Sequence, residues 1–531
     1  MIMGATTSSQ TSAFTPLRNP SYAVLWTATV VTNIGWWMYG AAAGWLMTEL
    51  SVDPLLVSLV QVASSLPMFL LALPAGALAD IVDKRRLLIV TEIAVVLAST
   101  MLAALVWLDR ITPFVLLFFT FLLGAGAALV APSWQSIVPL LVRRPEELPA
   151  AVALNSVGVN ISRAIGPALV GVLTLGVGVS APFWVNAFSN LGTVGALIWW
   201  RSPENASDEL PTERFLNAIV AGGRYARHNS LLRATLFHAV GFFLFASAYW
   251  ALLPLVARTQ IGGGPGLYGV LLGAIGAGAI LGALALPKLR AKLGPNGLVN
   301  AAAVGTAIAL GLFGAARDPW SALVASLLAG ACWIAAVSSF NVSAQFALPE
   351  WVRGRGLAIY VTVFSGALAL GSALWGQLAS MVGLSMAHFV AAAGALVAIP
   401  LTQRWKLQAS PGVDLAPSMH WPTPVTSLQI EEDAGPVLVT VEYKVLPQHC
   451  KTFLAAIERM SAQRRRDGAY AWGVFEDAAE PGRFLETFLV DSWLEHLRQH
   501  ARVTNADREL EERVHELLID EPIVTHLISR R

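Results

Sequence analysis

The sequence predicts an all-α polytopic membrane protein, with twelve transmembrane helices in two six-helix bundles, followed by a small C-terminal α+β domain. Three observations support this fold class: an apolar composition, a series of long apolar segments, and a polar C-terminal segment. Of the 531 residues, 55% are hydrophobic and 13% are charged, whereas about 25% of residues in an ordinary soluble domain are charged. The chain is therefore expected to lie in a lipid bilayer.

The twelve helices are counted from apolar windows. A bilayer core about 30 Å thick requires about 20 apolar residues in a helix, because backbone groups in hydrocarbon must bond within their own segment. The windows lie at residues 22–47, 55–79, 87–108, 112–138, 149–173, 182–200, 231–256, 268–286, 298–315, 321–347, 357–382 and 385–405. The polar N-terminus that precedes them lacks the apolar core and cleavage site of a signal peptide.

The distribution of Lys and Arg predicts the orientation, since positively charged loops stay in the cytoplasm. With the N-terminus inside, eighteen of these residues fall in inner segments and three in outer segments, namely Arg110, Arg258 and Arg317. We therefore expect a multi-pass protein of the cell membrane with both termini in the cytoplasm. The net charge of +1 provides no basic surplus for a nucleic-acid partner.

The two halves of the predicted membrane region repeat. PLLVR, from Pro139, follows the fourth helix and PEWVR, from Pro349, follows the tenth, while GPALVG and GSALWG occupy helices 5 and 11. Two related bundles with a site between them are typical of secondary transporters. The expected divisions are residues 1–20 (N-terminal segment), 21–200 and 231–406 (bundles), 201–230 (central cytoplasmic loop), 407–426 (proline-rich linker) and 427–531 (tail).

Short motifs resemble signatures of the major facilitator superfamily. The segment GALADIVDKR, between helices 2 and 3, resembles the pattern G-x-L-A-D-x-x-G-R-K/R, and Asp83 stands where many members have glycine. SRAIGPALVG in helix 5 resembles the antiporter signature, with Gly166, Pro167 and Gly171 at a bend. GAGAA in helix 4 is similar to a third signature, although Thr120 replaces its arginine. The subgroup with the greatest similarity is the transmembrane secretion effectors, which include the enterobactin exporter.

The resemblance implies a conformational latch formed by Gly76, Asp80, Lys84 and Arg85. Asp80 lies where helix 2 meets the cytoplasm, so its carboxylate can accept hydrogen bonds at the N-terminus of a neighbouring helix, with the helix dipole adding about 0.3–1 kcal/mol. Gly76, one turn earlier, allows close helix approach. The alternative is that these charges belong to a solvated loop that only maintains orientation.

Arg163 is the main cavity candidate. It lies deep in helix 5, where a charge is costly unless it faces protein or water. Ser156, Asn160 and Arg163 share one face of the helix, and this polar stripe is expected to face a central cavity and bind substrate. The alternative is that Arg163 extends to the membrane boundary or bonds a neighbouring carbonyl.

Other cavity candidates come from helices 1 and 7. Asn33 and Trp37 lie on one stripe of helix 1, and His238 and Tyr249 lie in helix 7. Trp37 and Tyr249 are expected to contact the substrate, whereas the alternative for His238 is a hydrogen-bonded packing role. Glu92, in helix 3, is the acidic residue placed well inside a predicted span and is the proton-coupling candidate.

The predicted strands and helices of the tail follow one another in the order β-α-β-β-α-β, and we expect a ferredoxin-like fold. The predicted strands are 437–445, 469–476, 483–490 and 522–528; the first helix is 448–465, and Ser492 and Thr504 are predicted N-caps. The tail resembles the antibiotic-biosynthesis monooxygenase-like and dimeric α+β barrel modules. His496 and His500 are one turn apart, but without a third ligand they do not predict a metal site.

Together these patterns predict a secondary-active efflux transporter for a small organic molecule, siderophore-like or lipophilic and drug-like, working by alternating access with proton antiport. We expect no enzyme activity, cofactor or metal. The expected partners are the substrate, the lipid bilayer, a proton gradient and, through the tail, a second copy of the chain. The alternatives are a membrane-tethered enzyme that uses the tail and a substrate sensor that does not transport.

Overall fold

The computed structural model describes residues 14–142, 144–201, 215–407, 414–422, 424, 430–431 and 433–529. The side chains of residues 77, 79–81, 145, 215–221, 350 and 501 lie outside this description. The chain forms two compact units. Unit 1 contains residues 1–212, 236–340 and 360–405, and unit 2 contains residues 213–235, 341–359 and 406–531.

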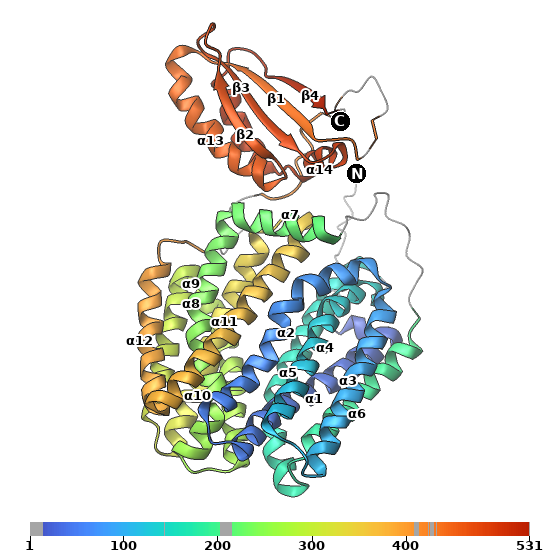
Figure 1. The fold of residues 1–531 in the computed structure, drawn as a ribbon, viewed down its shortest axis with the longest axis vertical. Helices are drawn as coiled ribbons and strands as arrows, with labels where there is room; N and C mark the ends of the chain where they lie inside the picture. Colours follow the sequence, from blue (N-terminus) through green and yellow to red (C-terminus); the bar gives the residue numbers. More distant parts are fainter. Residues whose placement is uncertain are drawn as a thin grey trace, which may run out of the picture. The chain divides into compact units, whose positions relative to one another are not determined.

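The first six long helices occupy the predicted N-terminal bundle (Figure 1). They are α1 (Pro20–Leu50), α2 (Pro54–Ile81), α3 (Lys84–Trp107), α4 (Pro113–Ile137), α5 (Leu148–Gly176) and α6 (Ala181–Trp199). Local chemistry explains several starts: the side chains of Asn19, Asp53, Asp83 and Thr112 accept hydrogen bonds from the first turns of α1 to α4, as N-cap residues do.

The second set of long helices is α8 (Ser230–Leu255), α9 (Pro265–Ala315), α10 (Pro319–Phe346), α11 (Arg353–Val382) and α12 (Leu384–Thr402). A π-helical turn, η4 (Val256–Gln260), follows α8. Gly294 has φ +65° and breaks the helical path of α9, a conformation that glycine adopts without the Cβ clash of other residues. The two predicted spans 268–286 and 298–315 lie on either side of this kink.

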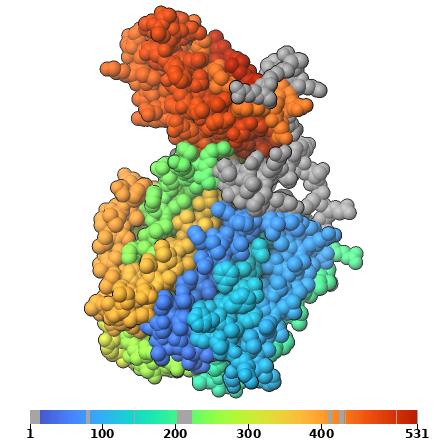
Figure 2. Space-filling view, viewed as in Figure 1, coloured from blue at the N-terminus to red at the C-terminus, as the bar shows by residue number. Residues whose placement is uncertain are grey.

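Among the described residues, nine helices are long and apolar enough to cross a membrane. They include α9, which covers two predicted spans, whereas α1 and α6 lie at two further predicted spans without meeting this criterion. Many membrane spans are thus established, and the number twelve stays a prediction. In the space-filling view, the blue surface of α2 adjoins the orange-yellow surface of α11 (Figure 2).

Unit 2 contains α7 (Phe215–His228), which lies inside the segment expected as a central loop. It also contains the tail elements β1 (Val437–Lys444), α13 (Cys450–Arg466), β2 (Tyr470–Glu476), β3 (Arg483–Val490), α14 (Trp493–Arg502), α15 (Asn505–His515) and β4 (Ile523–Ile528). The predicted strands and the first tail helix are confirmed within one or two residues. The side chains of Ser492 and Thr504 cap α14 and α15 as predicted.

The tail strands form one antiparallel sheet in the order β2-β3-β1-β4 (Figure 1). Alternate residues of β1 are buried, from Val437 to Tyr443. They form a core with Phe453 of α13, Trp493 of α14 and Val514 of α15. One face of the sheet is therefore covered by helices, and the other face lacks such a cover within the described tail.

Part of the segment expected to be a linker also bonds to the tail. The backbone N–H groups of Asn505 and Ala506 donate to the carbonyl groups of Ala416 and Asp414, and the N–H of Ser418 donates to Val503. Residues 414–421 thus form a strap on the tail. Composition alone did not reveal this packing, because proline-rich segments read as linkers in the absence of tertiary contacts.

Candidate functional site

The centre of unit 1 is built around α5, which packs against α1 and α9. A Cβ atom at Gly166 would lie 2.7 Å from the Trp37 Cβ and 2.9 Å from the Ile34 carbonyl oxygen, and one at Gly171 would lie 3.1 Å from the Gly266 Cα. Larger residues at these two positions would push the helices apart. These glycines, predicted at a helix bend, therefore let α5 approach α1 and α9 closely, and Pro167 lies between them inside α5.

Arg163 lies on α5 between these two packing faces. Its guanidinium carbon is 5.1 Å from the centroid of the Trp37 ring, a distance at which a cation is attracted to an indole ring. Its Nε is buried and has no hydrogen-bond partner among the described residues. The structure therefore brings together two of the predicted cavity residues, Arg163 and Trp37, and leaves the Nε donor of Arg163 without a partner among the described residues.

The rest of the predicted polar stripe is more exposed. Asn160 donates a hydrogen bond of 2.8 Å to the Ser156 carbonyl of its own helix, and its side chain is exposed. Asn33, one turn before Trp37 on α1, is half-buried. Since neither is enclosed by packing, these amides are accessible to water or a ligand.

Contacts between the two helix sets close one end of unit 1. The Ser380 hydroxyl of α11 donates to the Asp53 carboxylate at 2.7 Å, and Arg258 of η4 donates to the Thr48 hydroxyl of α1 at 3.1 Å. The guanidinium of Arg258 also lies 5.8 Å from the ring of Trp45. We call these residues the closed end. The sequence does not reveal these contacts, because partners more than 200 positions apart leave no local pattern.

An aromatic cluster occupies the interior of the second helix set. Trp333 of α10 lies 5.2 Å from Phe243, 5.4 Å from Trp250 and 6.4 Å from Tyr249, all of α8, measured between ring centroids. The Tyr249 hydroxyl and the Trp250 Nε1 are buried and have no hydrogen-bond partner within the described chain. Tyr249 was predicted, whereas Trp333 was missed because a lone tryptophan in an apolar helix gives no functional signal.

The predicted latch residues have different environments. The backbone of Asp80 belongs to α2, but its side chain lies outside the described residues. Arg85 donates to the carbonyls of Leu197 and Ile198 at 3.0 and 2.8 Å, so it bonds the C-terminal end of α6 in its own bundle, where a cation is favourable. Lys84 opens α3, and a Cβ at Gly76 would meet no atom within 4 Å.

Two other titratable candidates, Glu92 and His238, are buried. Glu92 of α3 is 5% exposed, and its Oε2 has no hydrogen-bond partner among the residues described. His238 of α8 bonds through Nε2 to the Trp405 carbonyl at 2.8 Å. This contact ties His238 to the segment that follows α12, which matches the packing alternative, while the proposed coupling role of Glu92 stays a prediction.

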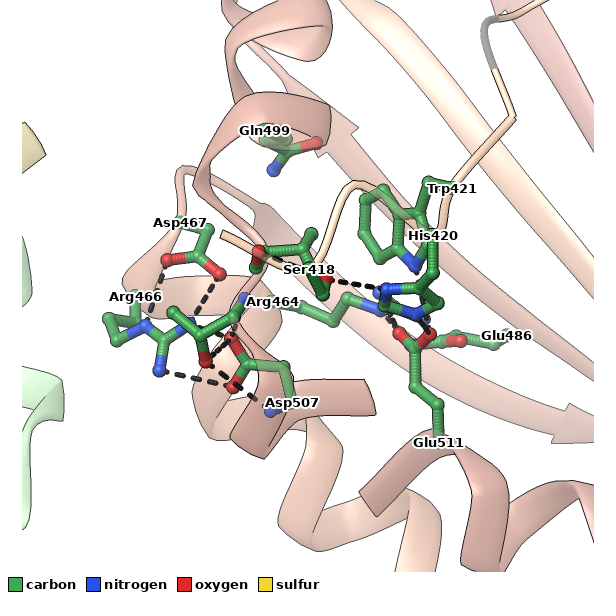
Figure 3. A network of polar contacts seen from close by, with 12 residues as sticks. Ser418, His420, Trp421, Arg464, Arg466, Asp467, Glu486, Gln499, Asp507 and Glu511 are labelled. Atoms are coloured by element: carbon green, nitrogen blue, oxygen red, sulfur yellow. Dashed lines mark hydrogen bonds and ion pairs between the residues drawn. The ribbon is translucent and has the colours of Figure 1, made fainter. Parts of the chain in front are cut away.

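The tail holds a buried polar network (Figure 3). Arg464 of α13 donates to Glu511 at 3.0 Å and to Glu486 at 3.4 Å, and His420 and Trp421 of the strap donate to Glu511 at 2.7 and 2.8 Å. Burial alone would raise the pKa of Glu511, but the Arg464 charge and these hydrogen bonds outweigh burial and lower the pKa to about 2. The network therefore joins the strap to the helices and sheet.

A second set of contacts lies within unit 2. Glu495 of α14 accepts from Arg224 of α7 at 3.1 Å and from Arg502 at 2.6 Å. The guanidinium of Arg502 lies 4.4 Å from the ring of Trp351, which precedes α11. The tail helix α14 thus contacts segments that adjoin α8 and α11 in sequence.

This helical arrangement is shared with solved transporters. A POT family transporter in complex with a thioalcohol-conjugated peptide aligns with a TM-score of 0.58 at 12% identity, over 72% of this chain and 96% of that one. A bacterial homologue of the human lysosomal transporter Spinster aligns with a TM-score of 0.57 at 14% identity, over 74% and 98%. At such identities the likeness establishes the fold alone, a bundle of many long helices that this chain shares with both proteins.

Sequence comparison identifies the family within this fold. Residues 11–531 match the family described as transmembrane secretion effector, and the chain belongs to this family of the major facilitator superfamily. It is 27% identical to the staphyloferrin A transporter of Staphylococcus aureus over 269 residues, covering 49% of this chain and 65% of that relative. It is 26% identical to the enterobactin exporter EntS of Shigella boydii over 372 residues, covering 68% and 86%.

Proposed function

We propose that this protein is a secondary-active exporter that moves a small organic molecule, siderophore-like or lipophilic and drug-like, by alternating access coupled to proton antiport. The observation that carries the proposal is Arg163, whose guanidinium lies over Trp37 on the α5 surface between α1 and α9. A permanent cation beside an aromatic ring suits an anionic ligand with aromatic groups. Family membership and the siderophore-related names of the two relatives support the same substrate class.

The closed end supports alternating access. In the predicted orientation, Asp53 and Ser380 lie toward the outside of the cell, so their hydrogen bond would hold the outer end closed while the inner end is open. The outward-open state would break this bond and bring the two helix sets together at the other end, where Asp80 is the proposed latch residue. The two states would then expose the Arg163 region to opposite sides of the membrane.

The tail is proposed to be a ferredoxin-like cytoplasmic module that pairs with a second copy. The sheet face opposite the helices carries Tyr470, Phe475, Leu485, Ile523 and Leu527, which are 38–62% exposed. Directly paired residues of antiparallel strands project from the same face of a sheet, and the pairings therefore place these side chains together. The pairs are Tyr470 with Leu489, Phe475 with Leu485, and Glu442 with both Leu485 and Ile523. An exposed apolar face of this kind is typical of a protein interface.

Flux through sealed proteoliposomes tests the transport proposal. Enterobactin, staphyloferrin A and a lipophilic dye are loaded separately, and export is followed with and without an imposed pH gradient. We expect gradient-dependent flux of at least one siderophore, with liposomes that contain Arg163→Ala protein at equal density as the control. Absence of flux for every compound would contradict export, and flux independent of the gradient would contradict proton antiport.

Truncation after Ala409 separates the alternatives. If the tail is a module on an exporter, the truncated protein should still transport. Chemical conversion of the substrate that depends on the tail would favour the membrane-tethered enzyme. Substrate binding without flux in the full-length protein would favour the sensor.

A further inference from the structure

Three histidines from two separate elements of the tail converge at one point. His496 and His500 lie on α14, and His526 lies on β4. One ring nitrogen from each lies within 4.8 Å of the others. The ring centroids are 4.9 Å apart for His496 and His500 and 4.6 Å apart for His496 and His526. His526 is far from His496 and His500 along the chain, but the fold brings it to them as a candidate third ligand.

The local structure explains why the rings meet. His496 and His500 are four residues apart, so they lie on the same face of α14. In the sheet, His526 is paired with Val439 of β1, and Val439 is 2% exposed in the core beneath the helices. Directly paired residues of antiparallel strands project from the same face, which places His526 on the side that α14 covers.

The spacing of the nitrogens suits a metal ion. The Nε2 atoms of His496 and His500 are 3.3 Å apart. Two imidazoles bound to one tetrahedral Zn²⁺ at about 2.0–2.1 Å have nitrogens separated by roughly 3.3 Å. The first two ligands therefore have the required separation, and a ring nitrogen of His526 lies within 4.8 Å of both.

The surroundings favour neutral imidazoles with available lone pairs. The His496 Nδ1 lies 3.2 Å from the Gln499 Oε1, and because an amide oxygen only accepts, Nδ1 carries the proton and Nε2 keeps its lone pair. Burial, together with the neighbouring histidines, lowers the pKa of His496 to about 3, and burial likewise lowers that of His500 to about 4. These two rings are therefore uncharged at neutral pH, as metal ligation requires, and burial also lowers the pKa of His526.

Aromatic rings surround the cluster. Trp421 of the strap lies 5.1 Å from the His500 ring, and Trp493 lies 5.5 Å from the His496 ring and 6.0 Å from the His526 ring, measured between centroids. His496 is 1% exposed, whereas His500 and His526 are half-buried. The site is thus shielded on the His496 side and accessible on the side of the other two rings.

We propose that His496, His500 and His526 form a binding site for one divalent transition-metal ion of the zinc class. Three imidazoles suit Zn²⁺, Cu²⁺, Ni²⁺ or Fe²⁺ and not Mg²⁺ or Ca²⁺, which prefer oxygen ligands. Three protein ligands leave one tetrahedral position for water or a small ligand. The competing arrangement is a metal-free cluster in which one Nε2 donates to the other.

Cobalt titration of the full-length protein distinguishes these arrangements. Detergent-purified protein without a polyhistidine tag is treated with chelator and titrated with Co²⁺, whose visible absorption reports tetrahedral coordination. We expect one Co²⁺ per chain, displacement by Zn²⁺, and a rise in thermal stability, because an ion that binds the folded state stabilises it. Absence of the absorption band in the wild-type protein would overturn the proposal.

Variants locate the bound ion. His526→Ala should abolish the band, and Gln499→Leu, which keeps all three ligands, should weaken binding by about 10–100-fold. The matched control is His515→Ala, which changes an exposed histidine of α15 and should leave binding unchanged. An unchanged titration in both His526→Ala and Gln499→Leu would place the ion elsewhere and refute the site. If His526→Ala proves unstable, an unchanged titration in Gln499→Leu refutes the site by itself.

Discussion

Ser380 of α11 donates a hydrogen bond of 2.7 Å to the carboxylate of Asp53 at the start of α2. The bond joins residues 327 positions apart and belongs to the closed end. Asp53 also caps α2 by accepting from the Leu55 N–H at 3.0 Å, so the same carboxylate serves local structure and contact between the two helix sets.

Ser380→Ala should shift the protein toward the state in which this end is open. Loss of one hydrogen bond of about 1 kcal/mol changes the ratio of open to closed molecules about five-fold. Spin labels at the exposed residues Val52 and Met381, with Cys332 and Cys450 replaced by serine, report the distance across this end. Ser136→Ala is the control, since Ser136 donates to Pro132 of its own helix. An unchanged distance distribution in Ser380→Ala would show that the bond does not hold this end closed.

Arg163→Ala should abolish transport between pH 6 and 8, whereas Arg163→Lys should retain part of it. Both variants change packing over Trp37, but lysine keeps a positive charge for an anionic group. Flux is compared at equal protein density in proteoliposomes. Arg317→Ala, which removes an arginine bonded to the Ala316 carbonyl, should transport normally. Full activity of both Arg163 variants would leave this residue with a packing role.

Asp80→Asn and Arg85→Ala should have different effects. Asp80→Asn keeps the side-chain shape and removes the charge of the proposed latch, so transport should fall more than expression does. Arg85→Ala removes the donor to the Leu197 and Ile198 carbonyls and should lower thermal stability. Flux and melting temperature are measured for both variants, and parental flux in Asp80→Asn would argue against the latch.

Phe475→Lys and Ile523→Lys should reduce self-association of the full-length protein. The change places charges on the open face of the tail sheet, where Phe475 is 60% and Ile523 is 62% exposed, and a buried unpaired charge is strongly unfavourable. Native mass spectrometry in detergent measures the dimer fraction. Leu454→Lys, at a 41% exposed position of α13, provides the control. A monomeric wild-type protein would disprove pairing through this face.

Glu511 should make the tail sensitive to acid. Its pKa falls from the ordinary 4.5 of a glutamate to about 2 in the folded tail, so its stabilisation is complete above pH 4.5 and is lost as the pH falls from 4.5 to about 2. Hydrogen exchange of β1 and α13 should accelerate over this range. Glu511→Gln should raise exchange at neutral pH and reduce the acid dependence, while Glu512→Gln, at an exposed position paired with Arg508, should change neither. An unaltered acid dependence in Glu511→Gln would assign it to another group.

The sequence alone determined the features that depend on neighbours along the chain. Apolar windows predicted long helices, alternation from Val437 predicted β1, and Ser492 and Thr504 predicted two helix starts, because periodicity and capping act within a few residues. The position of Arg163 on a polar stripe was also readable in this way. Tertiary structure decided the contacts between distant residues: Asp53 with Ser380, Trp333 with Tyr249, and His526 with His496. Each such contact depends on how helices and strands pack, and packing of elements far apart in the chain leaves no period or spacing in the sequence.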